Sequence, residues 1–454
     1  MEAMKTNETT PDATKQESAA SFEPCAPAKQ KVVLAYSGGL DTSVCLKWLQ
    51  EEKGFDVIAV CGNVGQDESD LSAIKQKALD MGAIASFAVD MREEYANEFL
   101  TCALAANGLY ENAYPLLSAL SRPLLSKHLV AIAHAFGAAC IAHGCTGKGN
   151  DQVRFETSIK ALDPALEIVA PVREWNLHSR EAEIEWAKQH GVPVAATKQS
   201  PYSIDDNLWG RAIECGALED PWCEPPADIW TMTVDPACAP DEPEYVEIEF
   251  ERGVPCKLDG VSMTFADIVK TLNEQAGKHG VGRLDMVENR LVGVKSRECY
   301  EVPAAQVLIA AHKALETLCL DGATQHYKLG VEQQWATAVY EGLWFSPLKM
   351  ALDSFCSATQ RFVTGTVKMK LFKGSCTAVG RKSPYSLYDF GLASYGAEDA
   401  FDHGAAQGFI ELHGLPVSTW SAKQGPAAHA AASAADAEDD GLRRAPAPAV
   451  VDAA

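Results

Sequence analysis

The feature that most constrains the fold is a short apolar run, followed at once by a glycine-rich loop and an amphipathic segment. Residues 32–36 (VVLAY) predict a buried strand, and residues 37–43 (SGGLDTS) form the loop. The apolar stripe after the loop predicts a helix. A strand, loop and helix in this order bring free backbone N–H groups and the positive end of a helix dipole together. We therefore predict a phosphate cradle; the alternative is a tight turn capped by Asp41, Thr42 and Ser43.

The alternation of strands and helices continues to about residue 196. Apolar runs at 57–61, 84–89, 138–142 and 168–170 predict further strands with helical segments between them. This pattern indicates an α/β fold whose parallel sheet is covered on both faces. A proline-rich crossing follows. After it the chain has alternating strands at 245–250, 255–258 and 363–371 and helical patterns at 265–272 and 302–320, which predict an α+β domain.

A chain of 454 residues favours two or three domains over one. Composition and pattern give five segments. They are a disordered tail at 1–29, a nucleotide-binding domain at 30–196, an α+β domain at 197–395, a C-terminal arm at 396–423 and a disordered Ala/Pro-rich tail at 424–454.

Charge and cysteine usage exclude several classes of partner. The formal net charge of -23 disfavours nucleic-acid binding, which needs clustered Lys and Arg. No apolar run approaches the roughly 20 residues of a membrane span, and no secretory signal is visible. The 14 cysteines include no C-x-x-C pair, so we predict reduced thiols, no protein metal site and a cytoplasmic location.

A second loop, residues 143–154 (HGCTGKGNDQVR), follows the predicted strand at 138–142. Ligands of open α/β sheets bind at the carboxyl ends of the strands, where this loop and the first one begin. Thr146, Asn150, Asp151 and Arg154 bring four kinds of polar group into twelve residues. Neither loop has the lysine spacing of a Walker A motif.

The S-G-G-x-D-[ST] pattern resembles the N-type ATP pyrophosphatases, or PP-loop enzymes, which cleave ATP to AMP and pyrophosphate. The second loop is similar to a signature of the argininosuccinate synthase family. Further segments at 110–123, 200–208 and 277–301 also match that family, and the resemblance covers about residues 31–412. It implies a PP-loop domain, a synthetase domain at 197–395 and a homotetramer joined by the C-terminal arm.

The resemblance also implies an activity in arginine biosynthesis or the urea cycle. It is the ATP-dependent condensation of L-citrulline with L-aspartate through citrullyl-AMP, with Mg²⁺ as cofactor. Adenylation is needed because a ureido oxygen leaves poorly and AMP leaves well.

Matching motif positions assigns the site residues. ATP is expected at Ala35, Tyr36, Ser37, Gly38, Gly39, Leu40, Asp41, Thr42, Ser43, Gly62 and Gly144. Aspartate is expected at Thr146, Asn150 and Asp151, and citrulline at Tyr114, Asn150, Arg154, Ser203, Glu288 and Tyr300. Catalytic roles fall to Asp41, Lys148 and Asp151, with Asp41 nearest Mg²⁺ and no obvious general base.

Two positions depart from the family pattern, because Ala119 and Ala212 stand where serines are frequent. We expect Ser118, backbone groups or water to supply the missing hydroxyls.

Rival hypotheses remain open at this point. A tRNA thiolase would need a cysteine pair, and a phosphoadenylylsulfate reductase matches only at residues 214–216. An amidotransferase would need a glutaminase, and a non-catalytic scaffold would have no need of Asp41, Lys148 and Asp151. The acidic tails could also recruit a partner.

Overall fold

The computed structural model describes residues 29–66, 71–177, 179–193 and 201–428. The chain divides into two compact units, with the boundary between Leu387 and Tyr388. Both predicted tails, at 1–29 and 424–454, lie almost wholly outside the described residues. The domain limits drawn from the sequence inside the first unit stay predictions.

The N-terminal part of the first unit is a five-stranded parallel sheet, as predicted. Its order is β3–β2–β1–β4–β5. The bounds are β1 Lys31–Ala35, β2 Asp56–Asn63, β3 Ala85–Asp90, β4 Cys140–Ala142 and β5 Glu167–Val169. Each lies within two residues of a predicted apolar run, because a strand buried on both faces needs a continuous apolar sequence.

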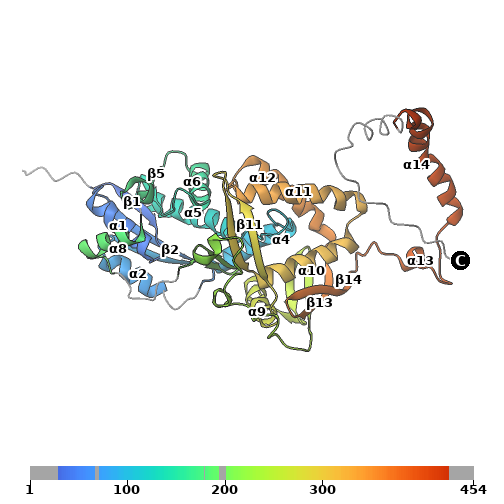
Figure 1. Ribbon diagram of the computed structural model, residues 1–454, viewed down its shortest axis with the longest axis horizontal. Coiled ribbons are helices and arrows are strands. Elements are labelled where there is room, and N and C mark those ends of the chain that lie inside the picture. The colour runs from blue at the N-terminus through green and yellow to red at the C-terminus, as the bar shows by residue number, and fades with distance from the viewer. Residues whose placement is uncertain (1–28, 67–70, 178, 194–200, 429–454) are drawn as a thin grey trace, which may run out of the picture. The chain divides into compact units, whose positions relative to one another are not determined.

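Helices cover both faces of this sheet (Figure 1). Val32 and Leu34 of β1 pack in the cluster that holds α1 (Leu40–Glu51), α2 (Leu71–Asp80) and α8 (Arg180–Gln189). Val33 points to the opposite cluster, formed with α5 (Leu117–Phe136) and α6 (Asp151–Leu162). Because side chains alternate between the two faces of a strand, one apolar run contributes to both hydrophobic cores.

The strand order fixes where a ligand can bind. The chain runs outward from β1 to β3 on one side and from β4 to β5 on the other, so the order reverses between β1 and β4. These strands pair in parallel, Val33 opposite Ile141. A crevice opens at such a reversal, at the carboxyl ends of the strands. Both predicted loops start there.

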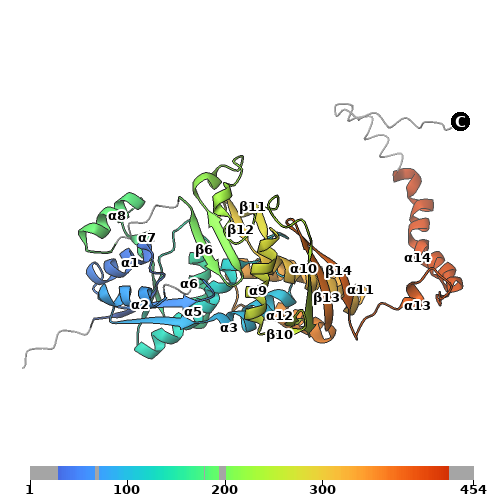
Figure 2. The same cartoon turned by 90° about the horizontal axis from the view of Figure 1, so that it is seen from below.

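Two antiparallel sheets complete the first unit (Figure 2). One has the order β11–β12–β7–β6, with bounds Arg283–Asn289, Lys295–Glu301, Gly210–Glu214 and Ser203–Asn207. The other has the order β10–β9–β8–β13–β14, with bounds Val261–Ser262, Val254–Leu258, Glu244–Glu251, Gly365–Phe372 and Ser375–Lys382. The predicted turn between β8 and β9 is a two-residue loop in which Arg252 and Gly253 both have positive φ.

Several elements had no counterpart in the sequence prediction. The predicted helices appear as α9 (Phe265–Lys278) and α10 (Pro303–Cys319), but α11 (Gly322–Tyr340) and α12 (Pro347–Thr359) were not predicted. Strands β6, β11 and β12 were recognised only as motifs and β7 was not predicted, because their polar residues line the site. Short elements are α3 Arg92–Glu94, the π-helix η2 Tyr95–Leu100, α4 Thr101–Ala105, α7 Pro171–Glu174, η3 Gly216–Glu219, η4 Ala227–Ile229 and η5 Gln360–Phe362.

The second unit contains α13 (Phe390–Ala393) and α14 (His403–Lys423). The sequence predicted a helix beginning near residue 405. Helix α14 leaves its large apolar side chains exposed: Phe409, Ile410, Leu412, Leu415, Val417 and Trp420. None of the helices that the structure describes is both long and apolar enough to cross a bilayer.

A buried polar network joins α10 and α11 to Asn107, which precedes the site segment 110–114. Lys328 is 1% exposed at its side chain, and its Nζ lies 2.7 Å from Glu332 Oε1 and 3.1 Å from Glu316 Oε1. Asn107 Nδ2 donates to both carboxylates at 2.7 Å. The next residues lead to Tyr110 and Tyr114, so the network anchors the start of that segment.

We expect Lys328→Met to destabilise the protein by about 3–5 kcal/mol, because it leaves two buried carboxylates without their cation. Urea unfolding followed by circular dichroism measures the change. Lys270→Met, on the exposed face of α9, removes the same charge and should shift the unfolding free energy by less than about 0.5 kcal/mol. Similar losses in the two variants would contradict a special role for the network.

Candidate active site

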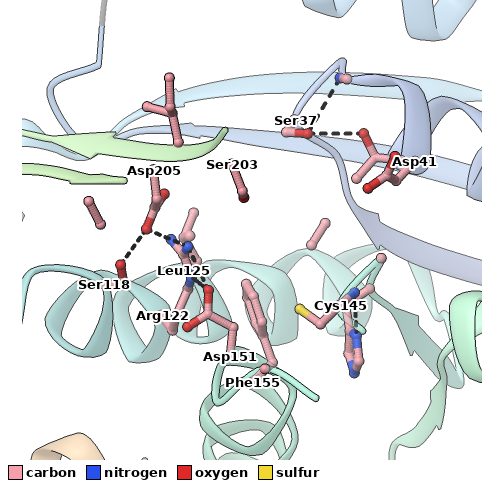
Figure 3. A pocket seen from close by; sticks show the side chains of 18 of the residues that line it. Ser37, Asp41, Ser118, Arg122, Leu125, Cys145, Asp151, Phe155, Ser203 and Asp205 are labelled. Carbon is pink, nitrogen blue, oxygen red and sulfur yellow. Dashed lines mark hydrogen bonds and ion pairs between the residues drawn. The ribbon is translucent and has the colours of Figure 1, made fainter. Parts of the chain in front are cut away.

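A cavity of about 740 Å³ lies at the predicted crevice. Both loops line it, together with residues of α5, β6, β7, β11 and β12. Figure 3 shows Ser37 and Asp41 from the first loop on one side, and Ser118, Arg122 and Asp205 on the other. The parallel sheet and the antiparallel sheet β11–β12–β7–β6 therefore each form part of one site.

The first loop presents backbone donors at the start of α1. Gly39 is the N-cap of α1, and among the described residues no side chain caps this helix. The capped-turn alternative for Asp41, Thr42 and Ser43 is therefore not what the structure has. Ser37 Oγ instead lies 3.1 Å from Thr42 Oγ1, and the Oγ of Ser43, which does not line the cavity, lies 3.2 Å from Tyr36 OH. Uncapped N–H groups at a helix start form an anion site.

Three glycines allow close approach at the site. Gly38 has φ +79°, and a Cβ there would lie 2.8 Å from Ile74 Cγ1. A Cβ on Gly62 would lie 2.3 Å from Leu125 Cδ2. A Cβ on Gly144 would lie 3.2 Å from Thr42 Cγ2, which brings the second loop against the first.

The second loop contributes polar groups to the same cavity. Thr146, Asn150 and Asp151 line it, and α6 begins at Asp151. Asn150 is buried, donates from Nδ2 to Tyr340 OH (2.8 Å) and accepts at Oδ1 from Leu291 N (3.0 Å). Lys148 is exposed and is not among the residues that line the cavity.

A chain of charges crosses the cavity floor (Figure 3). Asp151 accepts from Arg154 NH1 (2.8 Å) and Arg122 Nε (2.8 Å). Arg122 NH2 also donates to Asp205 Oδ2 (2.6 Å). Although burial alone raises it, the two guanidinium groups lower the pKa of Asp151 to about 2. Asp151 is therefore a carboxylate at every physiological pH.

The chain of charges also bears on the two alanine positions. Ala119 is fully buried in the core and does not line the cavity, whereas Ala212 does. Ser118 lines the cavity as expected, and its Oγ donates to Asp205 Oδ2 at 2.5 Å. A hydroxyl is thus present one position before Ala119, but it already has a partner.

An aromatic and acidic wall faces the loops. Tyr340 OH donates to Glu288 Oε1 (2.7 Å), and Tyr300 OH lies 2.9 Å from Glu288 Oε2 and 2.8 Å from Glu298 Oε2. Tyr114 stacks on Tyr300 with 4.4 Å between ring centroids. A phenol has one proton, so Tyr300 can donate to only one carboxylate, and the other contact needs a proton on the glutamate.

Glu298 is the group best placed to hold that proton. Burial, with Glu288 and Glu214 nearby, raises the pKa of Glu298 to about 8. Arg290 NH2 donates to Glu298 Oε1 (2.8 Å) and also to Glu214. One arginine therefore serves two of the three carboxyl groups on this wall.

The raised pKa of Glu298 predicts a pH dependence of stability. Between about pH 4.5 and 8 the folded protein keeps a proton that the unfolded chain has lost, so stability falls as pH rises through this window. The Glu298→Gln variant lacks this dependence. We expect the wild type to lose stability relative to the variant by up to about 1.4 kcal/mol per pH unit.

Urea unfolding at pH 5, 6, 7 and 8 measures the difference. The matched control is Glu274→Gln, on the exposed face of α9. A constant difference between wild type and Glu298→Gln across this range would refute the protonated Glu298.

Nearly all of the residues proposed from the sequence converge on the cavity. Ala35, Tyr36, Ser37, Gly39, Leu40, Asp41, Thr42, Gly62 and Gly144 line it, as do all the positions expected for aspartate and citrulline. Gly38, Ser43 and Lys148 do not. Sequence reasoning gave no role to seven charged residues that line it: Arg122, Arg180, Asp205, Asp206, Glu214, Arg290 and Glu298. Five of them, Arg122, Asp205, Asp206, Arg290 and Glu298, stood inside matched motifs, and that was the available signal.

The fold and the site define a HUP-domain protein with a synthetase domain. Residues 31–193 match the family model described as arginosuccinate synthase N-terminal HUP domain, and residues 202–420 match arginosuccinate synthase C-terminal domain. The chain belongs to the argininosuccinate synthase family, whose members are ATP-using ligases. Cys215, the cysteine of the reductase match, is not among the residues that line the cavity.

Curated relatives agree over most of the chain. Argininosuccinate synthase of Bacillus mycoides (strain KBAB4) is 58% identical over 393 residues, which are 87% of this chain and 97% of the relative. The enzyme of the same name from Oceanobacillus iheyensis is 58% identical over 398 residues, 88% of this chain and 95% of the relative. That of Bacillus thuringiensis (strain Al Hakam) is 58% identical over 393 residues.

Proposed function

We propose that this chain condenses L-citrulline with L-aspartate, cleaving ATP to AMP and pyrophosphate through citrullyl-AMP. The observation that carries the proposal is one cavity lined by the uncapped loop 37–42, the second loop and the Glu288–Tyr300 wall. These supply an anion cradle, a charged floor and an acidic wall, which the three substrates require.

In the first step the citrulline ureido oxygen attacks the α-phosphate and pyrophosphate leaves. The N–H groups at the start of α1, with the hydroxyls of Ser37 and Thr42, would hold the β- and γ-phosphates. Tyr36, Gly62 and Gly144 would shape the pocket for the rest of the nucleotide. Catalysis here is positioning and stabilisation of developing negative charge.

The carboxylate of Asp41 in the first loop would suit Mg²⁺ binding. Burial and the adjacent carboxylate of Asp41 raise the pKa of Glu183 to about 8, so two acidic groups face each other beside the loop. Paired carboxylates next to phosphates are typical magnesium ligands. Asp41 lines the cavity and Glu183 does not, so Asp41 would hold the ion, which would neutralise phosphate charge when bound.

Citrulline would lie between the charged floor and the aromatic wall. Glu288 and Tyr300 would face its α-ammonium, and Arg154 would face its α-carboxylate. Tyr114, Asn150 and Ser203 would complete the contacts. Because the hydroxyl of Ser118 is engaged with Asp205, it would reach citrulline only by sharing that bond, while water could fill the space beside Ala212.

Aspartate would bind at Thr146, Asn150 and Asp151, at the start of α6. In the second step its amine attacks the activated ureido carbon and AMP leaves, while the proton passes from the amine to solvent or to a neighbouring carboxylate. The ionised Asp151 would attract the ammonium form and align it. Lys148, exposed on the same loop, would meet substrate only from the mouth of the site.

We also propose a cytoplasmic location and a homotetramer. Every cysteine that the structure describes is a free thiol, as in reducing compartments. The apolar side chains exposed on α14 provide a contact surface for another copy.

ATP–pyrophosphate exchange tests the first step. Labelled pyrophosphate should enter ATP only when citrulline is present, because the ureido oxygen is the attacking group. Ornithine, which lacks the ureido group, is the matched negative control. Exchange that is indifferent to citrulline, in folded protein, would overturn the proposal.

Asp151→Asn tests whether Asp151 acts in the second step and not in the first. We expect citrulline-dependent exchange to stay within about fivefold of wild type, and argininosuccinate formation to fall by 100-fold or more, as for loss of a charged contact. Asp163→Asn, at the C-cap of α6 and outside the cavity, is the control. Equal loss of both activities would show that Asp151 serves citrulline as well.

A chain that ends at Leu387 tests the oligomer. We expect it to elute as a smaller species than the full chain, because it lacks the exposed apolar face of α14. A chain lacking only residues 429–454 is the matched control. An unchanged mass for the chain ending at Leu387, measured by light scattering, would contradict assembly through the arm.

A further inference from the structure

Lys77 of α2 bonds directly to the phosphate loop. Its Nζ donates to the backbone carbonyl oxygen of Gly38 at 2.8 Å. Ile74, one helical turn earlier, fills the space where a Gly38 side chain would stand. One face of α2 therefore fixes the loop at Gly38 by both packing and a hydrogen bond.

The ammonium of Lys77 has no carboxylate partner among the described residues. The buried Lys328 and Lys349 each lie within 2.8 Å of a carboxylate oxygen. Lys77 is only partly buried, and burial lowers its pKa. A partly desolvated cation behind an anion cradle gains a counter-charge when phosphate arrives.

Peptide geometry connects this bond to the cradle. The Gly38 carbonyl and the Gly39 N–H belong to one planar trans peptide, so they point in opposite directions. A carbonyl held toward α2 turns the Gly39 N–H away from α2. Gly39 lines the cavity and Gly38 does not, and the Gly39 N–H has only a long contact of 3.4 Å to Ser37 Oγ.

We propose that Lys77 is a positioning residue for the phosphate loop. It aims the Gly39 N–H at the pyrophosphate portion of ATP and adds a positive charge behind the loop. Since neither loop has a Walker-type lysine, α2 supplies this cation from outside the motif. The identity of the ligand as ATP rests on the proposed function. The binding measurement below tests Lys77 without depending on the citrulline chemistry.

Equilibrium binding of ATP with Mg²⁺, measured by calorimetry without citrulline, isolates the loop from the later chemistry. We expect Lys77→Met to weaken ATP binding by about tenfold or more, as for loss of a charged hydrogen bond. Lys75→Met, exposed on the same helix two residues away, should bind like wild type. Lys77→Arg keeps charge and donor and should recover most of the affinity.

Steady-state kinetics adds a readout that general destabilisation would not give. In Lys77→Met the KM for ATP should rise, while the KM values for citrulline and aspartate stay within about twofold of wild type. Should Lys77→Met not fold, Lys77→Gln, which keeps a donor without charge, takes its place and should weaken ATP binding less than tenfold but measurably.

Equal ATP affinity in Lys77→Met and Lys75→Met would overturn the proposal, as would a Lys77→Arg variant no better than Lys77→Met. Wild-type protein that binds ATP but shows no citrulline-dependent exchange would overturn the proposed function and leave the Lys77 inference standing. Wild-type protein that binds no ATP would overturn both.

Discussion

The parallel pairing of β1 with β4 is the constraint on which the site depends. Val32, Val33 and Leu34 lie opposite Cys140, Ile141 and Ala142, so two segments more than a hundred residues apart end at the same level. Their loops then meet closely enough that a Cβ on Gly144 would lie only 3.2 Å from Thr42 Cγ2. The phosphate cradle and the polar loop become one site because of this register, and the buried apolar faces of both strands hold the register in place.

Charge is arranged in layers around this junction. Backbone N–H groups at the start of α1, with Lys77 bonded to Gly38 O behind them, lie where we propose that phosphate binds. Alternating charges on the floor, from Arg154 to Asp205, neutralise one another while leaving polar atoms for amino-acid groups. The wall around Glu288 and Glu298 has more carboxyl groups than cations, which raises the pKa of Glu298 and suits an ammonium ligand. A net charge of -23 is thus compatible with a strongly anionic substrate, because the electrostatic potential at the site governs binding rather than the charge of the whole chain.

The segment from Asn107 to Tyr114 couples stability to the site. Asn107 is held by the buried carboxylates of Glu316 and Glu332, and Tyr110 stacks on Tyr340 with 3.6 Å between ring centroids. Tyr340 in turn bonds to Asn150 and Glu288. The positions of the proposed citrulline residues therefore depend on a core network outside the cavity. Mutations in that network should change both the geometry of the cavity and the unfolding free energy.

The sequence by itself determined the parallel sheet and both loops, because apolar runs, glycines and motif spacing are local signals, and most of the site residues proposed from it line the cavity. It did not reveal that Lys77 bonds to Gly38, that Arg122 joins Asp151 to Asp205, or that Lys148 does not line the cavity. It also missed β6, β7, β11 and β12 as a sheet, since their charged residues hide the strand pattern. Those facts rest on contacts between residues distant in sequence, and only the packing of helices and sheets sets the distances and burial that decide a partner or a pKa.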